Sequence, residues 1–263
     1  MKNNKRISPL LKWAGGKRWL VDYLLQYWDK HKERYFVEPF VGGMGITLGL
    51  LPKKVLLNDV NEHLINFYKW VQKGLIIELE MKYNKDIYLS YRERFNKLIK
   101  EGKSNSKEAA ELFYYLNRTC FNGLCRFNSS GEFNVPFGKY KTVNYKTDFS
   151  EYKEILKDWN FVTGDFSELV FDEDSFVYAD PPYDVEFTQY TKDSFSWNDQ
   201  VRLVEFLDKH KGPVIISNQL TERIYNLYTK AGYKIITLSA PRRINSNGDR
   251  KSVLEVLAIK NVG

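Results

Sequence analysis

The segment 176–187, FVYADPPYDVEF, ends a run of strand-forming residues at an acid, two prolines and a tyrosine. In an open α/β sheet, ligands bind at the carboxyl ends of the strands. There, the Asp180 carboxylate and the Pro181 carbonyl could accept both N–H groups of an exocyclic nucleobase amine and expose its nitrogen lone pair. The prolines would hold these acceptors in place, and Tyr183 could stack on an extruded base. The plainer alternative is a strand-terminating turn, which requires neither the acid nor the aromatic ring.

A second cluster, 36–51 (FVEPFVGGMGITLGLL), leads from a predicted strand through Gly42, Gly43 and Gly45 into an apolar helix. Glycine lets the backbone close on a ligand at a helix N-terminus, although the spacing departs from G-x-G-x-x-G. Asp59 follows the next predicted strand and could accept hydrogen bonds from ribose hydroxyls. Its alternative role is the N-cap of the helix after residue 60. Together, the glycine turn and the acid favour a nucleoside cofactor.

A third cluster, 12–20 (KWAGGKRWL), places paired glycines between a tryptophan and a lysine. Backbone and the Lys17 ammonium could approach a polar ligand here, with Trp13 as a flat apolar wall. A loop that packs its tryptophan on the core is an equally good interpretation. The spacing G-x-x-x-x-G-K-[ST] of a phosphate-binding loop is absent.

A fourth cluster, 117–141 (NRTCFNGLCRFNSSGEFNVPFGKYK), alternates basic and aromatic residues with Asn-Gly and Ser-Gly turns. Arg118, Arg126, Lys139 and Lys141 on such loops suit phosphate contacts, while the aromatics suit base stacking and the polar groups suit base-edge reading. The alternative is a hairpin that packs its aromatic rings inward.

The elements that position these clusters alternate between strand-like runs and helical stretches, which predicts an α/β fold with a mostly parallel sheet. The runs are 34–40, 53–59, 159–166, 175–183, 212–218, 233–240 and 252–261. The last two flank the turn residues 247–249 (Asn-Gly-Asp) and predict a closing antiparallel hairpin.

Between the second and third strands, amphipathic helical segments dominate, and Ser106 is placed to cap the one that begins SKEAAELFYYL. This pattern predicts a core domain formed by 1–62 and 156–263 with an inserted domain at 63–155.

The composition limits the class of partner. Lys and Arg number 40 against 33 Asp and Glu, a net charge of +7 that favours a polyanion. Two cysteines, Cys120 and Cys125, and three scattered histidines predict neither a disulfide framework nor a metal site. We see neither a signal peptide nor a membrane span and therefore expect a cytoplasmic protein; the sequence does not indicate an oligomeric state.

With these clusters in hand, the chain resembles the Dam-type (α group) DNA adenine-N6 methyltransferases. In that family the cofactor motif comes first, target recognition second and DPPY third, as FVEPFVGG, the inserted block and DPPY do here. The resemblance also includes GDF (164–166), FTQYT (187–191) and ISN (216–218). It implies a Rossmann-like methyltransferase sheet, an inserted, mainly helical target-recognition domain with a β-hairpin, S-adenosylmethionine as methyl donor and double-stranded DNA as substrate.

The resemblance also implies roles for individual residues. Cofactor contacts would come from Trp13, Lys17, Phe40, Gly42, Asp59, Asp165, Phe166 and Asp180, and catalysis from Asp180, Pro181 and Tyr183. DNA contacts would come from Lys12, Phe121, Asn122, Leu124, Arg126, Pro136 and Lys139. Phe121 stands where some relatives carry tyrosine; stacking survives the change, but a hydroxyl contact is lost.

These residues predict direct methyl transfer to adenine N6 in GATC, by displacement and without a metal. Arg126 suits a guanine, Lys12 a further guanine, and Leu124 and Pro136 a thymine methyl. Open alternatives are a different or longer site, an N4-cytosine enzyme, and a catalytically silent DNA-binding homologue. A cytosine-C5 enzyme is disfavoured because no cysteine follows a proline, and an oxidoreductase because the glycine fingerprint is incomplete.

Overall fold

The computed structural model describes residues 7–184, 195–240 and 253–263. Its centre is a seven-stranded sheet in the order β3-β2-β1-β4-β5-β7-β6. The strands are β1 (Phe36–Glu38), β2 (Val55–Asp59), β3 (Trp159–Thr163), β4 (Phe176–Ala179), β5 (Val214–Gln219), β6 (Lys234–Ala240) and β7 (Val253–Lys260). Each lies within a predicted run, except that β5 extends one residue beyond 212–218, while the predicted turn at 247–249 and the segment 187–191 fall outside the described residues.

The first five strands pair in parallel, and β7 pairs antiparallel with both β5 and β6. Parallel neighbours place all their carboxyl ends at one edge of the sheet, so the residues that follow β1, β2, β4 and β5 lie along that edge. The predicted fold class, a mostly parallel sheet with a C-terminal antiparallel hairpin, is confirmed.

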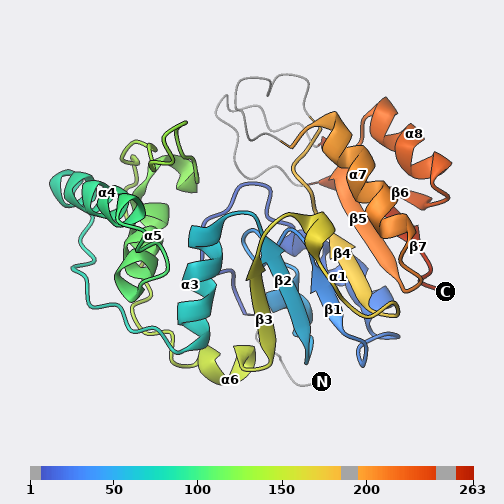
Figure 1. Cartoon of the computed structure of the whole chain (residues 1–263), viewed down its shortest axis with the longest axis horizontal. Helices are drawn as coiled ribbons and strands as arrows, with labels where there is room; N and C mark the ends of the chain where they lie inside the picture. Colours follow the sequence, from blue (N-terminus) through green and yellow to red (C-terminus); the bar gives the residue numbers. More distant parts are fainter. Residues whose placement is uncertain (1–6, 185–194, 241–252) are drawn as a thin grey trace.

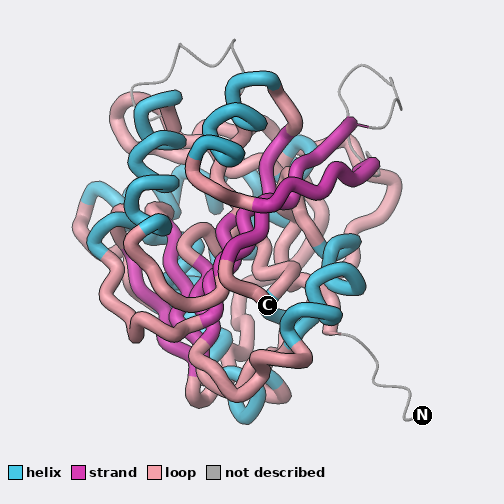
Figure 2. Tube along the Cα trace, turned by 90° about the vertical axis from the view of Figure 1, so that its right-hand side faces the viewer, coloured by secondary structure: helices cyan, strands magenta, loops and turns pink. Residues whose placement is uncertain are grey.

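Both faces of the sheet are covered because its strands are apolar on both sides. In β4, Phe176 and Tyr178 pack into the core cluster that contains residues of α1 (Val21–Trp28) and α3 (Glu62–Gln72). Val177 and Ala179 pack into the opposite cluster, with α7 (Trp197–Asp208) and α8 (Glu222–Lys230). Figure 2 shows the strands as one twisted band between helices.

The inserted block carries α4 (Lys85–Lys100) and α5 (Lys107–Thr119), which lie beside α3 and away from the strands (Figure 1). The side chain of Ser106 accepts a hydrogen bond from the backbone N–H of Ala109, so the predicted cap of α5 is confirmed. The block ends at the short helix α6 (Tyr152–Leu156). Because α3 contacts both α5 and the sheet, it joins the block to the core.

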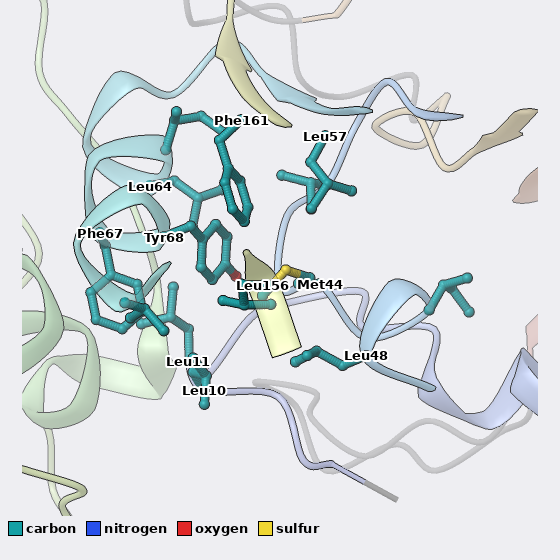
Figure 3. Close-up of a cluster of buried hydrophobic side chains, with 14 of the residues drawn as sticks. Leu10, Leu11, Met44, Leu48, Leu57, Leu64, Phe67, Tyr68, Leu156 and Phe161 are labelled. Atoms are coloured by element: carbon teal, nitrogen blue, oxygen red, sulfur yellow. The ribbon is translucent and has the colours of Figure 1, made fainter. Parts of the chain in front are cut away.

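A buried apolar cluster supports the segment that follows β1 (Figure 3). The rings of Tyr68 and Phe161 stack with centroids 5.8 Å apart, and Met44 and the short helix α2 (Thr47–Leu50) pack against the same cluster. No described helix is both long enough and apolar enough to cross a lipid bilayer.

Candidate active site

Asp180 follows β4 directly and forms an ion pair with Lys17. The Lys17 ammonium lies 2.8 Å from Oδ1 of Asp180 and donates a hydrogen bond of 3.1 Å to Oδ2. The Ser217 hydroxyl, from the neighbouring strand β5, donates to Oδ1 at 2.8 Å and lies 2.8 Å from the hydroxyl of Tyr178. The predicted catalytic acid is therefore held from two sides, by the glycine-lysine segment and by β5.

Burial and the partner's charge act in opposite directions on each member of this pair. Burial opposes the charge on Lys17, but the Asp180 carboxylate raises the pKa of the ammonium above its ordinary value. Burial also raises the pKa of Asp180, and the Lys17 ammonium and the Ser217 hydroxyl work against that rise. A carboxylate has about four acceptor positions, so Asp180 can accept a further N–H while it holds both of these partners.

Tyr183 lies beside the same lysine. Its hydroxyl donates a hydrogen bond to Glu255 of β7, and the Lys17 ammonium sits 4.6 Å from the centre of its ring. Glu255 is buried, and burial raises the pKa of its carboxyl above the ordinary value. Its second oxygen, Oε2, has no hydrogen-bond partner among the described residues. Glu255 was not among the residues predicted from the sequence, although an acid inside the apolar run VLEVLAI was an available signal.

The prolines of DPPY are fixed by polar contacts behind the site. Pro181 is buried, and the Pro182 carbonyl accepts a hydrogen bond of 2.8 Å from the Gln200 side chain. Gln200 in turn accepts from Asn218 at 3.1 Å. These contacts tie the loop after β4 to α7 and β5, so the backbone that carries the predicted Pro181 acceptor is anchored in the core.

The glycine turn after β1 and the acid after β2 lie together. Asp59 accepts a hydrogen bond of 3.0 Å from the Gly42 N–H and another of 3.0 Å from the Asn61 N–H. The Tyr68 hydroxyl donates to the Gly42 carbonyl at 2.8 Å. Asn61, not Asp59, caps α3 through its side chain. The alternative role of Asp59 as the helix cap is therefore wrong.

Trp13 packs directly on this turn. At Gly42, where φ is +43°, an added Cβ would lie 2.7 Å from the indole nitrogen of Trp13. At Gly43, it would lie 2.7 Å from the Cβ of the same tryptophan. Only glycine permits this approach. The N-terminal segment and the glycine turn therefore form one surface.

A second buried acid lies in the turn sequence. Glu38, the last residue of β1, is buried and accepts a hydrogen bond from the Thr47 hydroxyl. Burial raises the pKa of its carboxyl to about 8, so it is mostly protonated at neutral pH. Glu38 had no role among the predictions from the sequence. Its position between strand-forming residues and a proline (FVEPF) was nevertheless a signal in the sequence.

The aromatic residues predicted to contact the cofactor also meet. The rings of Phe40 and Phe166 lie 5.5 Å apart, and Phe40 is only partly buried. Asp165 accepts from the Ser167 N–H at 3.0 Å and pairs with Arg202 at 2.6 Å. The Arg202 guanidinium also lies 5.0 Å from the centre of the Phe166 ring. The residues after β3 thus extend the edge formed by those after β1 and β2.

The segment predicted to form a DNA-reading hairpin folds back on itself, but with little strand pairing. It is held by two isolated antiparallel bridges, Cys120 with Phe137 and Phe127 with Phe133, rather than by long strands. Its aromatic rings Phe127 and Phe133 pack inward, as the alternative interpretation expected, whereas Phe121, next to the bridge residue Cys120, is 39% exposed. Inward packing therefore holds for two of the rings, and base stacking by Phe121 stays a prediction.

The predicted base readers and phosphate contacts lie along this hairpin. Arg126 is exposed, and its Nε donates to the Asn134 side chain at 2.8 Å. Pro136 and Lys139 are exposed, and Asn122 and Leu124 are half-buried. Lys12, from the N-terminal segment, joins them: its ammonium donates to the Arg118 carbonyl at 3.0 Å and lies 3.4 Å from the centre of the Tyr140 ring. Burial lowers the pKa of Lys12 to about 8.

Neither cysteine is placed as a nucleophile. Both thiols are free, and burial raises the pKa of Cys120 and that of Cys125 to about 12. A thiol with such a pKa carries almost no thiolate at neutral pH. Across residues 7–184, 195–240 and 253–263, no three His, Cys, Asp or Glu side chains are grouped as metal ligands.

A doubly wound sheet with this glycine turn, this acid after β2 and DPPY after β4 defines a Rossmann-like methyltransferase. The family of D12 class N6 adenine-specific DNA methyltransferases matches residues 13–244, and the chain belongs to that family. The predicted resemblance is confirmed. The protein is therefore a site-specific DNA methyltransferase of the adenine-specific kind, and its family implies DNA as substrate and S-adenosylmethionine as methyl donor.

Named relatives span nearly the whole chain. "Type II methyltransferase M.MjaIII" of Methanocaldococcus jannaschii is 36% identical over 97% of this chain and 99% of its own length. "Type II methyltransferase M1.LlaDCHI" of Lactococcus lactis subsp. cremoris is 33% identical, with 100% and 98% covered. "DNA adenine methylase" of Escherichia coli is 34% identical, with 98% and 97% covered.

Proposed function

We propose that this protein methylates N6 of the adenine in GATC in duplex DNA, with Asp180 as the acceptor that activates the amine. The observation that carries the proposal is the ion pair between the Asp180 carboxylate at the end of β4 and the Lys17 ammonium, 2.8 Å apart, with the centre of the Tyr183 ring 4.6 Å from the same ammonium. An acceptor that is charged and fixed before the substrate arrives costs no reorganisation during the reaction.

S-adenosylmethionine, when bound, supplies the methyl group as a sulfonium that an amine can displace directly. The residues around Asp59 fit its nucleoside part, because each Asp59 oxygen holds one backbone N–H and retains capacity for a ribose hydroxyl. Phe40 and Phe166 offer aromatic surface for an adenine ring. Trp13 and Lys17 complete the contacts proposed on the N-terminal segment.

The chain's own residues then act on the target base. Asp180 and the Pro181 carbonyl accept the N–H groups of the amine, which directs its lone pair out of the conjugated ring. Tyr183, oriented by Glu255, stacks on the extruded adenine. After transfer, the amine holds one surplus proton, which the Asp180 carboxylate can accept. No step requires a covalent enzyme intermediate or a metal.

Residues of the exposed hairpin, together with the family resemblance, support the proposed target site. Arg126 can pair with O6 and N7 of one guanine and Lys12 can donate to another, while Leu124 and Pro136 suit a thymine methyl. Phe121 would fill the stack beside the extruded base, and Asn122 and Lys139 would contact phosphates. The division into a core domain (1–62, 156–263) and an inserted DNA-reading domain (63–155) is part of this proposal, as is action on the DNA of a prokaryotic or phage-infected cell.

Methylation mapping tests the proposal. The gene is expressed in a host without adenine methylation, and modified adenines are located by sequencing; Asp180→Ala, expressed to the same level, is the matched control. We expect N6-methyladenine in GATC with the natural chain and none with Asp180→Ala, although that variant still binds duplex. Methylation at a longer or unrelated site would refute the target, and turnover by Asp180→Ala would refute the role of the acid.

A further inference from the structure

Asn117, in the last turn of α5, holds the backbone of Lys12, which lies 105 positions earlier in the chain. Its Oδ1 accepts from the Lys12 N–H at 2.9 Å, and its Nδ2 donates to the Lys12 carbonyl at 2.8 Å. The side chain also reaches the Gly123 carbonyl at 3.5 Å and is 2% exposed. A single buried amide thus joins the N-terminal segment to the start of the predicted DNA-reading hairpin.

Gly123, in the hairpin, packs closely against Lys12. Its φ is +64°, and an added Cβ would lie 2.3 Å from the Cβ of Lys12. The Lys12 ammonium bonds to the Arg118 carbonyl at 3.0 Å. Lys12 is therefore held along its backbone, its Cβ and its ammonium by residues 117–123.

The next residue in the chain, Trp13, packs on Gly42 and Gly43. One peptide bond therefore separates the clamp from the surface proposed for the cofactor. A second link runs in parallel: the Asn61 N–H donates to Asp59 at 3.0 Å, and the Asn61 side chain bonds to the sulfur of Cys125 at 3.2 Å. Residues 121–125 are thus joined to both strand-end segments of the proposed cofactor site.

We propose that Asn117 is a positioning residue that fixes the DNA-reading loop 121–125 relative to Trp13 and the Gly42 turn, and so links target binding to cofactor binding. The identity of both ligands rests on the proposed function. A fixed junction means that ordering the loop on DNA also orders Trp13, and that ordering Trp13 on the cofactor also orders the loop. The linkage is reciprocal, because each ligand must change the affinity of the other by the same factor.

Only an amide serves at this position, because the clamp needs one donor and one acceptor in a plane. Asn117→Asp keeps the size and the acceptor but turns the donor into an oxygen that faces the carbonyls of Lys12 and Gly123. A buried acceptor left without its donor is destabilised. The variant should therefore release Lys12, itself a proposed guanine contact, from the loop while leaving the other proposed ligand contacts in place.

The chain offers a matched control. Asn96, on α4, forms the same clamp on the hairpin residue Phe133: its Oδ1 accepts from the Phe133 N–H at 2.8 Å and its Nδ2 donates to the carbonyl at 3.1 Å. This clamp lies within the inserted block and does not involve the N-terminal segment. Asn96→Asp therefore measures the effect of losing such an amide clamp where the N-terminal segment is not involved.

A second pair of variants perturbs the junction from the other side. Gly123→Ala introduces a Cβ that collides with Lys12, whereas Gly131→Ala, at a similar φ of +73°, meets nothing within 4 Å. Both substitutions impose the same backbone strain on the hairpin. Only Gly123→Ala displaces Lys12, so a comparison of the two variants separates the effect of backbone strain from the effect of moving Lys12. The pair tests the proposal even if Asn117→Asp does not fold.

The experiment measures the affinity of each full-length variant for S-adenosylhomocysteine, by calorimetry, with and without a duplex that contains the mapped methylation site. The ratio of the two dissociation constants is the linkage factor. We expect a factor of about fivefold or more for the natural chain, Asn96→Asp and Gly131→Ala. We expect it to fall toward one for Asn117→Asp and Gly123→Ala.

A factor of one in the natural chain, or an equal loss in the control variants, would overturn the proposal while leaving the proposed function intact. A natural chain that binds neither S-adenosylhomocysteine nor the duplex would overturn both. Retention of the full factor in Asn117→Asp or Gly123→Ala would show that the junction does not link the two sites.

Discussion

Removal of one partner from the ion pair between Lys17 and Asp180 should be strongly destabilising. The two side chains are only 4% and 20% exposed, and the charged atoms lie 2.8 Å apart. Removal of one partner from a buried pair costs about 3–5 kcal/mol, because the remaining charge is left uncompensated. Since Asp180 retains some exposure, we expect Lys17→Met to lower the free energy of unfolding by about 3 kcal/mol, at the lower end of that range.

A double-mutant cycle isolates this contribution. Lys17→Met and Asp180→Asn should each be destabilising alone, and the double variant should recover about 2 kcal/mol relative to the sum, because no unpaired charge remains. The assay is urea unfolding at neutral pH without ligand. The surface pair of Lys211 and Glu173 is the control: its atoms lie 2.7 Å apart, but its side chains are 75% and 72% exposed. Such a pair should couple by less than about 1 kcal/mol.

The raised pKa of Lys17 also predicts how the coupling energy of this ion pair depends on pH. Because Asp180 raises the pKa of Lys17 above its ordinary value, the stabilisation is fully present below that ordinary value and is lost only as the pH rises through the folded-state pKa. The coupling energy should therefore be constant between neutral pH and about pH 9. Additive effects of Lys17→Met and Asp180→Asn, or equal coupling in the surface pair, would refute the reasoning.

Three further perturbations have defined outcomes. Burial lowers the pKa of His63 to about 4, so stability should fall by up to about 3 kcal/mol as the pH drops from about 6.5 toward 4, and His63→Phe should remove this slope in acid unfolding curves. Gly42→Ala should weaken S-adenosylhomocysteine binding about tenfold or more in calorimetry, because its Cβ would collide with Trp13, whereas Gly15→Ala, which meets nothing within 4 Å, should cost much less. Lys139→Ala should lower the salt slope of duplex binding by about one without a change in base-pair preference, and a selective loss at one base pair would make this lysine a base reader.

The sequence predicted most of the fold because its signals are local. Apolar runs of strand formers located all seven strands, and Ser106 placed the start of α5. Strand ends were predicted too far out by two to four residues in 34–40 and 175–183, since polar and proline residues there belong to the loops that carry the site. The predicted hairpin is held by two isolated bridges and by inward packing of its aromatic rings rather than by long paired strands, and strand pairing of this kind has no local signal in the sequence.

The parts that escaped prediction depend on distant pairing. Glu255 contacts Tyr183 across 72 positions, and Asn117 contacts Lys12 across 105. Neither spacing has a periodicity that can be read in one sequence, because it is set by sheet order and helix packing rather than by local geometry. Asp59 shows that a local sequence rule can also mislead. A local rule suggested a helix cap, and a tertiary contact with Gly42 decided otherwise.

The position of β7 in the sheet has a consequence for synthesis of the chain. Although β7 follows β6 in sequence, it lies between β5 and β6 and pairs with both. Until residues 253–260 emerge from the ribosome, β5 has an unpaired edge, β6 has no strand to pair with, and Tyr183 lacks the Glu255 acceptor. The surface around Tyr183, proposed above to hold the target base, therefore becomes complete only when the last strand has inserted between β5 and β6.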